Sequence, residues 1–475
     1  METGLLLKNC FAVWPGAGDD LLRNTDILIK GPGIVSVSGS GDGEGATATG
    51  LNADDPGQEA PVRIIDCSDH IVIPGLVNTH HHFYQTLTRN IPAVQDAELF
   101  DWLVHLYDIW KHLDEEAIYY SSMLAMGELL KTGCTLSTDH HYLYPEAVET
   151  DIMATQFKAA RTLGIRFSPT RGSMSLGRKN GGLPPDSVVQ TEEEILGDSE
   201  RVIHEFHDPS DWAMNKVVLA PCSPFSVSRA LMKDTADLAR KHHVRLHTHL
   251  AETRDENDYC MKTYGTRPLD LMESCGFTGE DVSYAHGIHF DDAELERIKE
   301  SGTHIAHCPT SNMRLGSGIC RVVEMNRMGI NVGLAVDGSA SNDSSDMLGE
   351  VRNALLLQRV KYGAAAINAR DVLTMATING ARMLNFNRIG RVEKGYAADL
   401  AVFNIRKMEY AGALSDPLAA LVFSGYNHAT TYTIVNGKLC VDNGNLVGAS
   451  EDTITGMANA LSEQMIRRHE NHGSR

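Results

Sequence analysis

The segment VNTHHHFYQTLTR, residues 77–89, carries three consecutive histidines at the end of an apolar run. Successive side chains of a β-strand point to opposite faces. A strand at this position therefore directs His80 and His82 to one face and His81 to the other. Two imidazoles on one face are able to bind a single metal ion through their ring nitrogens. The segment thus predicts half of a metal site at the end of a strand.

From residue 71 onward, short runs rich in β-branched residues alternate with longer segments whose apolar residues have helical spacing. The eight runs are HIVIPGLVNTH, CTLSTDH, GIRFSPTR, KVVLAPC, VRLHTHL, VSYAHG, THIAHCP and NVGLAVDG. Alternation of strands and helices is typical of a parallel sheet, and eight such units close a (β/α)8 barrel of the TIM type. We therefore predict an α/β fold with a barrel over residues 71–390.

The segments on either side of the barrel contain β-type runs separated by turns. Residues 1–70 and 391–450 are predicted to form one small β-sandwich domain together. Within the first segment, residues 40–62 are rich in Gly, Asp and Ala and are predicted to be a flexible surface insertion, because they have few large apolar side chains to offset the entropy of ordering. Residues 451–475 are predicted to form a C-terminal helix and a tail.

The composition favours an enzyme that acts on a small molecule. A formal net charge of −20 disfavours binding to nucleic acid or to anionic lipid, both of which require clusters of Lys and Arg. No stretch approaches roughly 18 uninterrupted apolar residues, so no membrane span is predicted. The N-terminus lacks the features of a signal peptide, and the nine cysteines form no CxxC pair, which is typical of reduced thiols. We therefore expect a cytoplasmic protein.

Side chains suited to catalysis recur at the ends of the predicted strands, which in a barrel meet on one rim. The predicted ligands of one divalent metal ion are His80, His82, His249 and Asp337. Three nitrogens and one oxygen leave a position for water, as a catalytic zinc site requires, and water on such an ion ionises near neutral pH. We expect Zn2+, although the same ligands also accept Fe2+.

The order of these motifs resembles the amidohydrolase superfamily. The motifs are PGLVNTHHH (residues 74–82), HTHLAE (247–252), YAHG (284–287) and VDGSASN (336–342). Two-metal members of this superfamily use a carboxylated lysine on the fourth strand, but that strand here, VVLAPCSPF, has only Lys216 at its beginning. The resemblance therefore implies the one-metal branch, which contains nucleobase deaminases and triazine hydrolases. A two-metal cyclic amidase and a barrel that merely stores metal are the competing classes.

Three further stretches are more particular, namely HHHFYQTLTR (residues 80–89), DHHYLYP (139–145) and RGSMSLGRKNGGLPPDSVVQ (171–190). They resemble the bacterial 8-oxoguanine deaminases, which are related to hydroxydechloroatrazine ethylaminohydrolases. The resemblance implies hydrolysis of 8-oxoguanine to urate and ammonia, and a homo-oligomer. Hydroxyatrazine-type aminotriazine hydrolysis and deamination of guanine or isocytosine remain as alternatives.

The resemblance also implies roles for the residues near the metal ligands. We expect Glu252 to protonate the ring nitrogen beside the reacting carbon, and Asp337 to accept a proton from the attacking water. We expect His286 to hydrogen-bond the developing charge. Each of these residues lies at or just after the end of a predicted strand.

Candidate substrate contacts come from the loops and strand ends around this centre. The resemblance assigns Gln85 to substrate binding, and we expect Arg171 to meet the 8-oxo carbonyl and His140 to touch the substrate. His247 is predicted to be a packed interior residue. Trp102 either covers the pocket or belongs to the core, because aromatic residues at helical spacing are usually buried.

Overall fold

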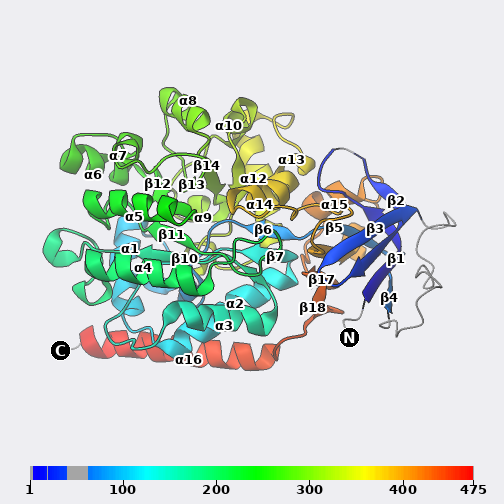
Figure 1. Cartoon of the computed structure of the whole chain (residues 1–475), viewed down its shortest axis with the longest axis horizontal. Helices are drawn as coiled ribbons and strands as arrows, with labels where there is room; N and C mark the ends of the chain where they lie inside the picture. The colour runs from blue at the N-terminus through cyan, green and yellow to red at the C-terminus, as the bar shows by residue number, and fades with distance from the viewer. Residues whose placement is uncertain (1–3, 19, 40–61, 474–475) are drawn as a thin grey trace.

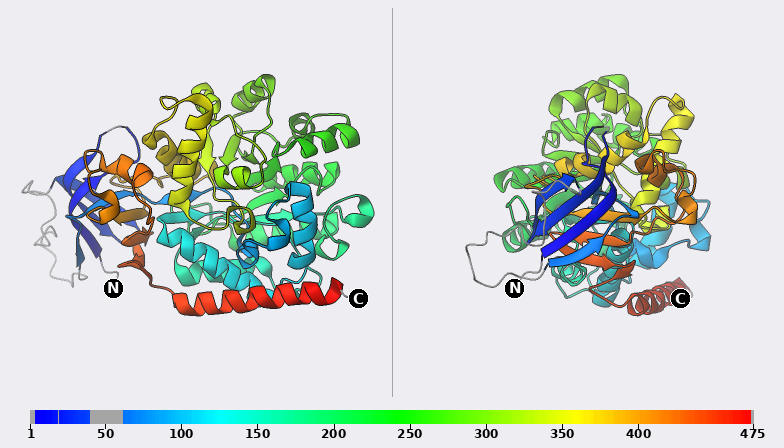
Figure 2. Two further views of the ribbon diagram at one scale, coloured as in Figure 1. Left: turned by 180° about the vertical axis from the view of Figure 1, so that it is seen from behind. Right: turned by 90° about the vertical axis from the view of Figure 1, so that its right-hand side faces the viewer.

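The computed structural model describes residues 4–18, 20–39 and 62–473 (Figure 1). Apart from Val62, the predicted insertion at residues 40–62 lies outside the described residues. The described chain forms a barrel with a β domain at one end, and the C-terminal helix runs along one side (Figure 2).

The barrel has eight parallel strand positions, as predicted, and two of them consist of two short pieces each. In chain order the strands are β6 (Leu76–Asn78), β7 (Cys134–Ser137) with β8 (His140–His141), β9 (Arg166–Phe167) with β10 (Thr170–Ser173), β11 (Val218–Pro221), β12 (Arg245–Leu250), β13 (Val282–His286), β14 (His304–His307) and β15 (Val332–Leu334). Backbone hydrogen bonds from Thr79 N to Leu334 O and from Asp337 N to His80 O, each 3.1 Å long, join the first strand to the last. The barrel is therefore closed.

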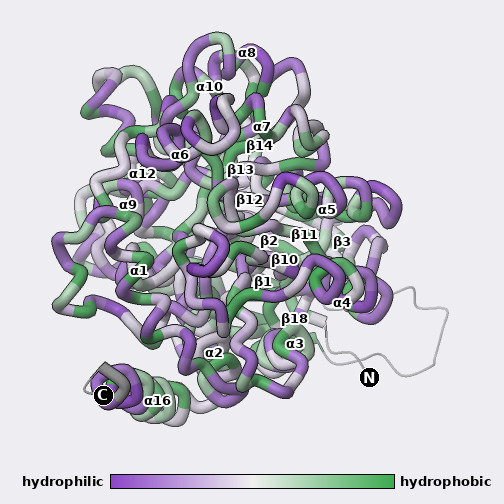
Figure 3. Tube along the Cα trace, turned by 90° about the vertical axis from the view of Figure 1, so that its left-hand side faces the viewer, coloured by the Kyte–Doolittle hydropathy of each residue, from purple (hydrophilic) through white to green (hydrophobic). Residues whose placement is uncertain are grey.

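Helices cover the outside of the barrel, and the strand ends occupy the middle when the molecule is seen from the end opposite the β domain (Figure 3). Several helices begin at a side chain that accepts a free backbone N–H, which is the preferred start of a helix; Asp114, for example, accepts from Ala117 N. The main helices are α2 (Glu115–Lys131), α3 (Ile152–Leu163), α4 (Glu192–Phe206), α5 (Arg229–Lys241), α6 (Arg254–Tyr264), α7 (Pro268–Ser274), α8 (Asp292–Ser301), α9 (Pro309–Arg314), α10 (Val322–Met328), α11 (Ser339–Asn342), α12 (Met347–Tyr362), α13 (Ala369–Thr374), α14 (Gly380–Met383) and α15 (Pro417–Phe423).

The N- and C-terminal segments build the β domain jointly, as predicted. Its strands are β1 (Gly4–Val13), β2 (Leu22–Lys30), β3 (Gly33–Gly39), β4 (Val62–Asp66), β5 (His70–Pro74), β16 (Leu400–Asn404), β17 (Tyr432–Val435), β18 (Lys438–Asp442) and β19 (Asn445–Leu446). Hydrogen bonds connect them into one nine-stranded sheet, in which β5 and β16 pair antiparallel and join the two segments. Ile27 and Ile434, from the two halves of this sheet, belong to one apolar cluster, as the predicted sandwich requires.

The run HIVIPGLVNTH, taken from the sequence as one barrel strand, is divided between the two domains. Its first half forms β5 in the β domain, and its second half contains β6, the first strand of the barrel. Gly75 lies at the break, where a Cβ atom would stand 2.1 Å from Thr135 Oγ1. The close approach of the neighbouring strand thus requires glycine here, and the barrel begins at Leu76 rather than at residue 71.

Two further helices close one side of the barrel mouth. Helix α1 (Leu99–Trp110) follows the first strand, and α16 (Glu451–Gly473) packs against both α1 and α2. The hydroxyl of Ser462 on α16 donates to Leu87 O at 2.6 Å, and Leu461 and Met465 share an apolar cluster with Trp102. Among the described helices, none has a stretch long and apolar enough to cross a membrane.

A buried ion pair fastens the barrel to the β domain. Arg166 on β9 donates from Nε and Nη2 to the two carboxylate oxygens of Asp399, each at 2.9 Å. Both side chains are at most 1% exposed. Asp399 also accepts the backbone N–H of Asn436 at 2.8 Å, so that the carboxylate links β9 to the turn between β17 and β18.

We predict that Asp399→Asn lowers the free energy of unfolding by about 3 to 5 kcal/mol, because it leaves the buried Arg166 guanidinium without a counter-charge. Urea denaturation measures the change. Asp237→Asn is the matched control, because it breaks the exposed pair with Lys233 four residues away and should cost no more than about 0.5 kcal/mol. Equal losses in the two variants would contradict the assigned role of Arg166 and Asp399.

Candidate metal centre and active site

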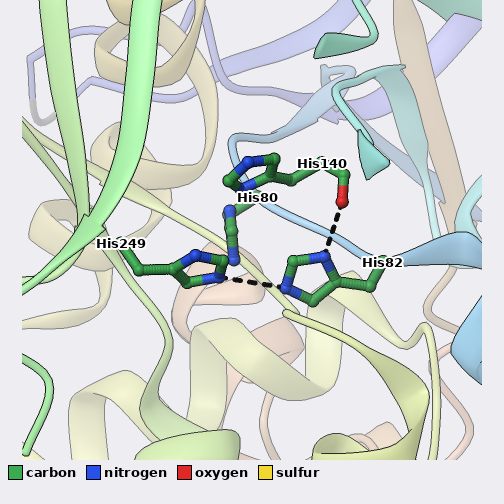
Figure 4. Close-up of side chains that lie close together, drawn as sticks. All are labelled: His80, His82, His140 and His249. Carbon is green, nitrogen blue, oxygen red and sulfur yellow. Dashed lines mark hydrogen bonds between the residues drawn. The ribbon is translucent and has the colours of Figure 1, made fainter. Parts of the chain in front are cut away.

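The four predicted metal ligands meet at the carboxyl ends of the barrel strands. Asp337 Oδ1 lies 3.4 Å from His80 Nε2 and 3.3 Å from His82 Nε2. His249 Nε2 lies 3.2 Å from His82 Nε2 (Figure 4). Side chains from the first, fifth and eighth strands therefore gather at one point.

The tautomers of His82 and His249 follow from their other ring nitrogens. His82 Nδ1 lies 2.8 Å from His140 O, and His249 Nδ1 lies 2.6 Å from Cys222 O. A carbonyl oxygen only accepts hydrogen bonds, so each Nδ1 carries the proton and each Nε2 carries a lone pair. The short approach of the two Nε2 atoms therefore brings two lone pairs together.

His80 has the same tautomer for a different reason. Its Nδ1 lies 2.8 Å from His247 Nε2, and His247 Nδ1 lies 2.8 Å from Ser283 Oγ. The Ser283 hydroxyl donates to Leu246 O and therefore accepts from His247 Nδ1. His247 Nε2 must then accept from His80 Nδ1, which leaves His80 Nε2 with a lone pair and, among the described residues, no hydrogen-bond partner.

These atoms fit a divalent metal ion. Three imidazole lone pairs and one carboxylate oxygen converge in a buried site, and no hydrogen atom lies between these acceptor atoms. A bound cation would stabilise such a set of acceptors. Burial lowers the pKa of His80 and His249 well below its usual value and lowers that of His82 as well, so the rings are neutral, as metal ligation requires. Burial alone would raise the pKa of Asp337, but the charge of the nearby His286 contributes to holding it well below its usual range.

Beside the ligands lies a second group of charged side chains. His286 Nδ1 pairs with Asn312 Oδ1 at 2.9 Å, and His286 Nε2 lies 3.5 Å from Glu252 and 3.9 Å from Asp337. Burial would lower the pKa of His286, but the two carboxylates raise it. Burial raises the pKa of Glu252 to about 6. Glu252 is therefore able to exchange a proton near neutral pH, which suits a general acid or base.

The backbone is strained where two of these side chains leave their strands. His286 has φ 73° and Asp337 has φ 64°, both in the left-handed region that residues with a Cβ atom rarely adopt. Such conformations cost about 1 to 3 kcal/mol each and cluster at functional sites. At Asp337 the turn also brings Gly338 N to 2.7 Å from Oδ1, where it donates a hydrogen bond to the carboxylate.

A narrow cavity of about 30 Å³ opens from this centre toward helix α1. The charged and imidazole groups form one part of its lining, and apolar or aromatic side chains form the rest. The lining residues are His82, Gln85, Leu99, Trp102, Leu103, Tyr107, Tyr142, Cys222, Phe225, His249, Glu252, His286, Leu315, Asp337 and Ser341. Gln85, placed by the 3-10 helix over Phe83–Thr88, has an Oε1 with no partner among the described residues. Gln85 therefore has an acceptor available in the cavity wall.

The structure does not bring Arg171 to this cavity. Arg171 is in register with His141, whose side of the sheet faces the outer helices, so the guanidinium points toward α4. Its donors pair with Asp198 at 2.7 Å and Gln190 at 2.8 Å, and its plane stacks on Tyr144. The predicted contact with an 8-oxo carbonyl therefore finds no support.

His140 and His81 also lie outside the cavity lining. His140 belongs to a buried group with His80, His82 and His249 whose possible ligand atoms lie within 4.8 Å of one another. Its ring stacks on His249 with centroids 4.8 Å apart, and its Nε2 pairs with Ala220 O at 3.1 Å. His81 points outward and lies 3.0 Å from Ser345 Oγ, as strand alternation predicted. Lys216 donates to Asn385 O, and therefore does not serve as a ligand on the fourth strand.

Sequence reasoning missed the partner of His80. His247 was predicted to be a packed residue, but it fixes the His80 tautomer. The spacing HTH did place both histidines on one face, which was the signal available. The backbone carbonyl of Cys222 orients His249. This contact could not be predicted from the sequence, because every residue has a backbone carbonyl.

We predict that Gly338→Ala disables the site through Gln85. An added Cβ atom would stand 1.9 Å from Gln85 Oε1, whereas the φ of −71° at Gly338 suits alanine. Displacing the amide by about 1 Å is expected to reduce kcat/KM by roughly 10²-fold. A double-mutant cycle with Gln85→Ala measures the coupling. The glycine substitution should cost little in the Gln85→Ala background; a full loss there would refute the mechanism.

Comparisons with known proteins agree with this geometry. The profile of the amidohydrolase family matches residues 71–440. The chain is 45% identical to the 8-oxoguanine deaminase of Pseudomonas aeruginosa, over 89% of this chain and 93% of that protein. It is 36% identical to hydroxydechloroatrazine ethylaminohydrolase of Pseudomonas sp. strain ADP, over 94% of this chain and 92% of that one.

Among solved structures, atrazine chlorohydrolase from Arthrobacter aurescens TC1 complexed with zinc superposes with a TM-score of 0.89 at 29% identity, over 96% of this chain and all of that one. The family match covers most of the chain. This chain belongs to the amidohydrolase family.

Proposed function

We propose that this protein is a metal-dependent deaminase that hydrolyses 8-oxoguanine to urate and ammonia. The observation that carries the proposal is the position of Glu252, with a pKa raised to about 6, at the edge of a centre built from three neutral imidazoles and Asp337. The 45% identity to an 8-oxoguanine deaminase supports this substrate.

The metal we propose is Zn2+, held by His80, His82, His249 and Asp337. When bound, Zn2+ lowers the pKa of a water from 15.7 to about 7, so that hydroxide is available at neutral pH. The nitrogen-rich ligand set and the zinc-complexed structural relative support zinc over other divalent ions.

The chain's own residues move the protons. The Asp337 carboxylate is ionised, since its pKa lies well below the usual range with the charge of His286 nearby, and it accepts a proton from the attacking water. Protonated Glu252 donates to the ring nitrogen beside C2, which removes the amidine resonance of that carbon. The water oxygen bonds to C2. Asp337 then passes its proton to the exocyclic nitrogen and Glu252 recovers a proton from the new C2 hydroxyl, so that the bond from C2 to the exocyclic nitrogen breaks and the nitrogen leaves as ammonia.

Two further residues hold the reacting groups. His286, whose pKa the neighbouring carboxylates raise, presents a positive imidazole between Glu252 and Asp337 and stabilises the negative charge that develops on oxygen. Gln85 orients the purine by hydrogen bonds to its amide edge. All nine cysteines are buried free thiols, which supports a reducing compartment, and we propose a cytoplasmic homo-oligomer.

A second candidate is release of an alkylamine from a hydroxylated triazine. The 36% identity to hydroxydechloroatrazine ethylaminohydrolase favours it, as does the apolar wall that Leu99 and Leu103 give the cavity. The ring carbon attacked is chemically equivalent in the two reactions. Incubation of zinc-loaded protein with 8-oxoguanine, guanine and hydroxyatrazine separates the candidates. A larger kcat/KM on hydroxyatrazine than on 8-oxoguanine would overturn the proposed substrate.

We predict that Glu252→Gln retains the metal but lowers kcat on 8-oxoguanine by about 10² to 10⁴-fold, the usual contribution of a positioned proton donor. Ammonia release and zinc content are measured on the same preparation. A Glu252→Gln variant with normal turnover would remove Glu252 from the reaction.

We predict one tightly held metal ion per chain, and its loss in His249→Ala. His307→Asn is the matched control, because His307 is also a buried barrel histidine but lies outside the groups of possible ligand atoms. Elemental analysis after dialysis should give about one zinc per chain for the wild type and the control. Retention of zinc by His249→Ala would argue against this ligand set.

A further inference from the structure

The wall of the cavity formed by α1 contains one polar atom whose purpose the reaction leaves open. Trp102 lines the cavity between Leu99 and Leu103, which have no hydrogen-bonding groups. The residue is 3% exposed, and its indole Nε1 has no hydrogen-bond partner among the described residues. A buried donor without an acceptor is costly, about 1 to 3 kcal/mol, and calls for an explanation.

The neighbouring tryptophan shows what a satisfied donor looks like in the same cluster. Trp110 is the last residue of α1, and its ring centroid is 5.5 Å from that of Trp102. Trp110 Nε1 donates to Thr88 Oγ1 at 2.9 Å. The two indoles share one apolar cluster, but of the two only Trp102 lines the cavity and lacks an acceptor.

We propose that Trp102 Nε1 donates a hydrogen bond to the C8 oxygen of the substrate and is the residue that selects 8-oxoguanine over guanine. This inference rests on the proposed function. The reacting C2 must lie near Glu252 and Asp337 at the strand ends, whereas Trp102 belongs to the helix that forms the outer wall of the same cavity.

The shape of the purine connects these two places. C2 and C8 lie at opposite ends of the fused ring system, so a base with C2 at the strand ends directs C8 away from them. In 8-oxoguanine C8 carries a carbonyl oxygen, which accepts a hydrogen bond, whereas in guanine C8 carries only hydrogen. A site built to hydrogen-bond one group rejects the analogue that lacks it. Trp102 thus supplies the hydrogen bond to the C8 oxygen that was expected from Arg171, which instead pairs with Asp198.

The test compares Trp102→Phe with wild type on three bases. The variant keeps an aromatic ring but lacks the donor. We expect kcat/KM to fall about tenfold on 8-oxoguanine, the value of one such hydrogen bond. On guanine and on isocytosine, which has the reacting amidine but no C8 oxygen, kcat/KM should change by less than about threefold.

Trp110→Phe is the matched control, because it removes the donor that pairs with Thr88. It should lower the Tm and leave the ratio of kcat/KM between 8-oxoguanine and isocytosine unchanged. Trp102→Phe removes no hydrogen bond from the free protein, so its Tm should fall less than that of Trp110→Phe.

An equal loss on all three bases, or no loss on 8-oxoguanine, would overturn the role of Trp102 while the proposed reaction stands. A wild-type enzyme that deaminates isocytosine but not 8-oxoguanine would overturn the proposed substrate and this inference together. A selective loss on 8-oxoguanine alone supports both.

Discussion

The site depends on a single electrostatic constraint, namely that three imidazole lone pairs point at one another inside the protein. Each ring is held in that tautomer by an acceptor at its Nδ1, which is His140 O for His82, Cys222 O for His249 and the His247 ring for His80. Without a cation, the nitrogen lone pairs would repel one another and the Asp337 carboxylate, and these buried acceptors would have no hydrogen-bond donor. The barrel therefore builds a cation site, and its closure between the first and last strands brings the carboxylate to it.

The chemistry and the selectivity reside in different parts of the same cavity. Strand ends supply the charged groups, and strained backbone at His286 and Asp337 turns two of them toward the centre. The wall opposite comes from α1, which α16 supports from outside through Leu461 and Met465. Rigid strands suit groups that must hold a proton or an ion in place. A covering helix is free to vary with the substrate, in keeping with the variety of ring substrates named among the relatives.

Much of this arrangement was predictable because barrel strands impose a simple rule on side-chain direction. Alternation placed His80 and His82 inside and His81 outside, and the order of the strands placed His249 and Asp337 on the same rim. The same rule was misapplied to Arg171, because one residue of register decides whether a strand-end side chain meets substrate or the outer helices. The break at Gly75 and the partner of His80 depend on contacts between distant segments, which a single sequence does not display.

Anomalous diffraction at the zinc edge from crystals of the metal-loaded protein tests the central claim most directly. The account predicts one peak per chain, about 2.0 to 2.2 Å from Nε2 of His80, His82 and His249 and from a carboxylate oxygen of Asp337. A peak bound instead by the sulfur of Cys222, which lies 3.9 Å from His249 Nδ1, or two peaks sharing the carboxylate, would contradict it.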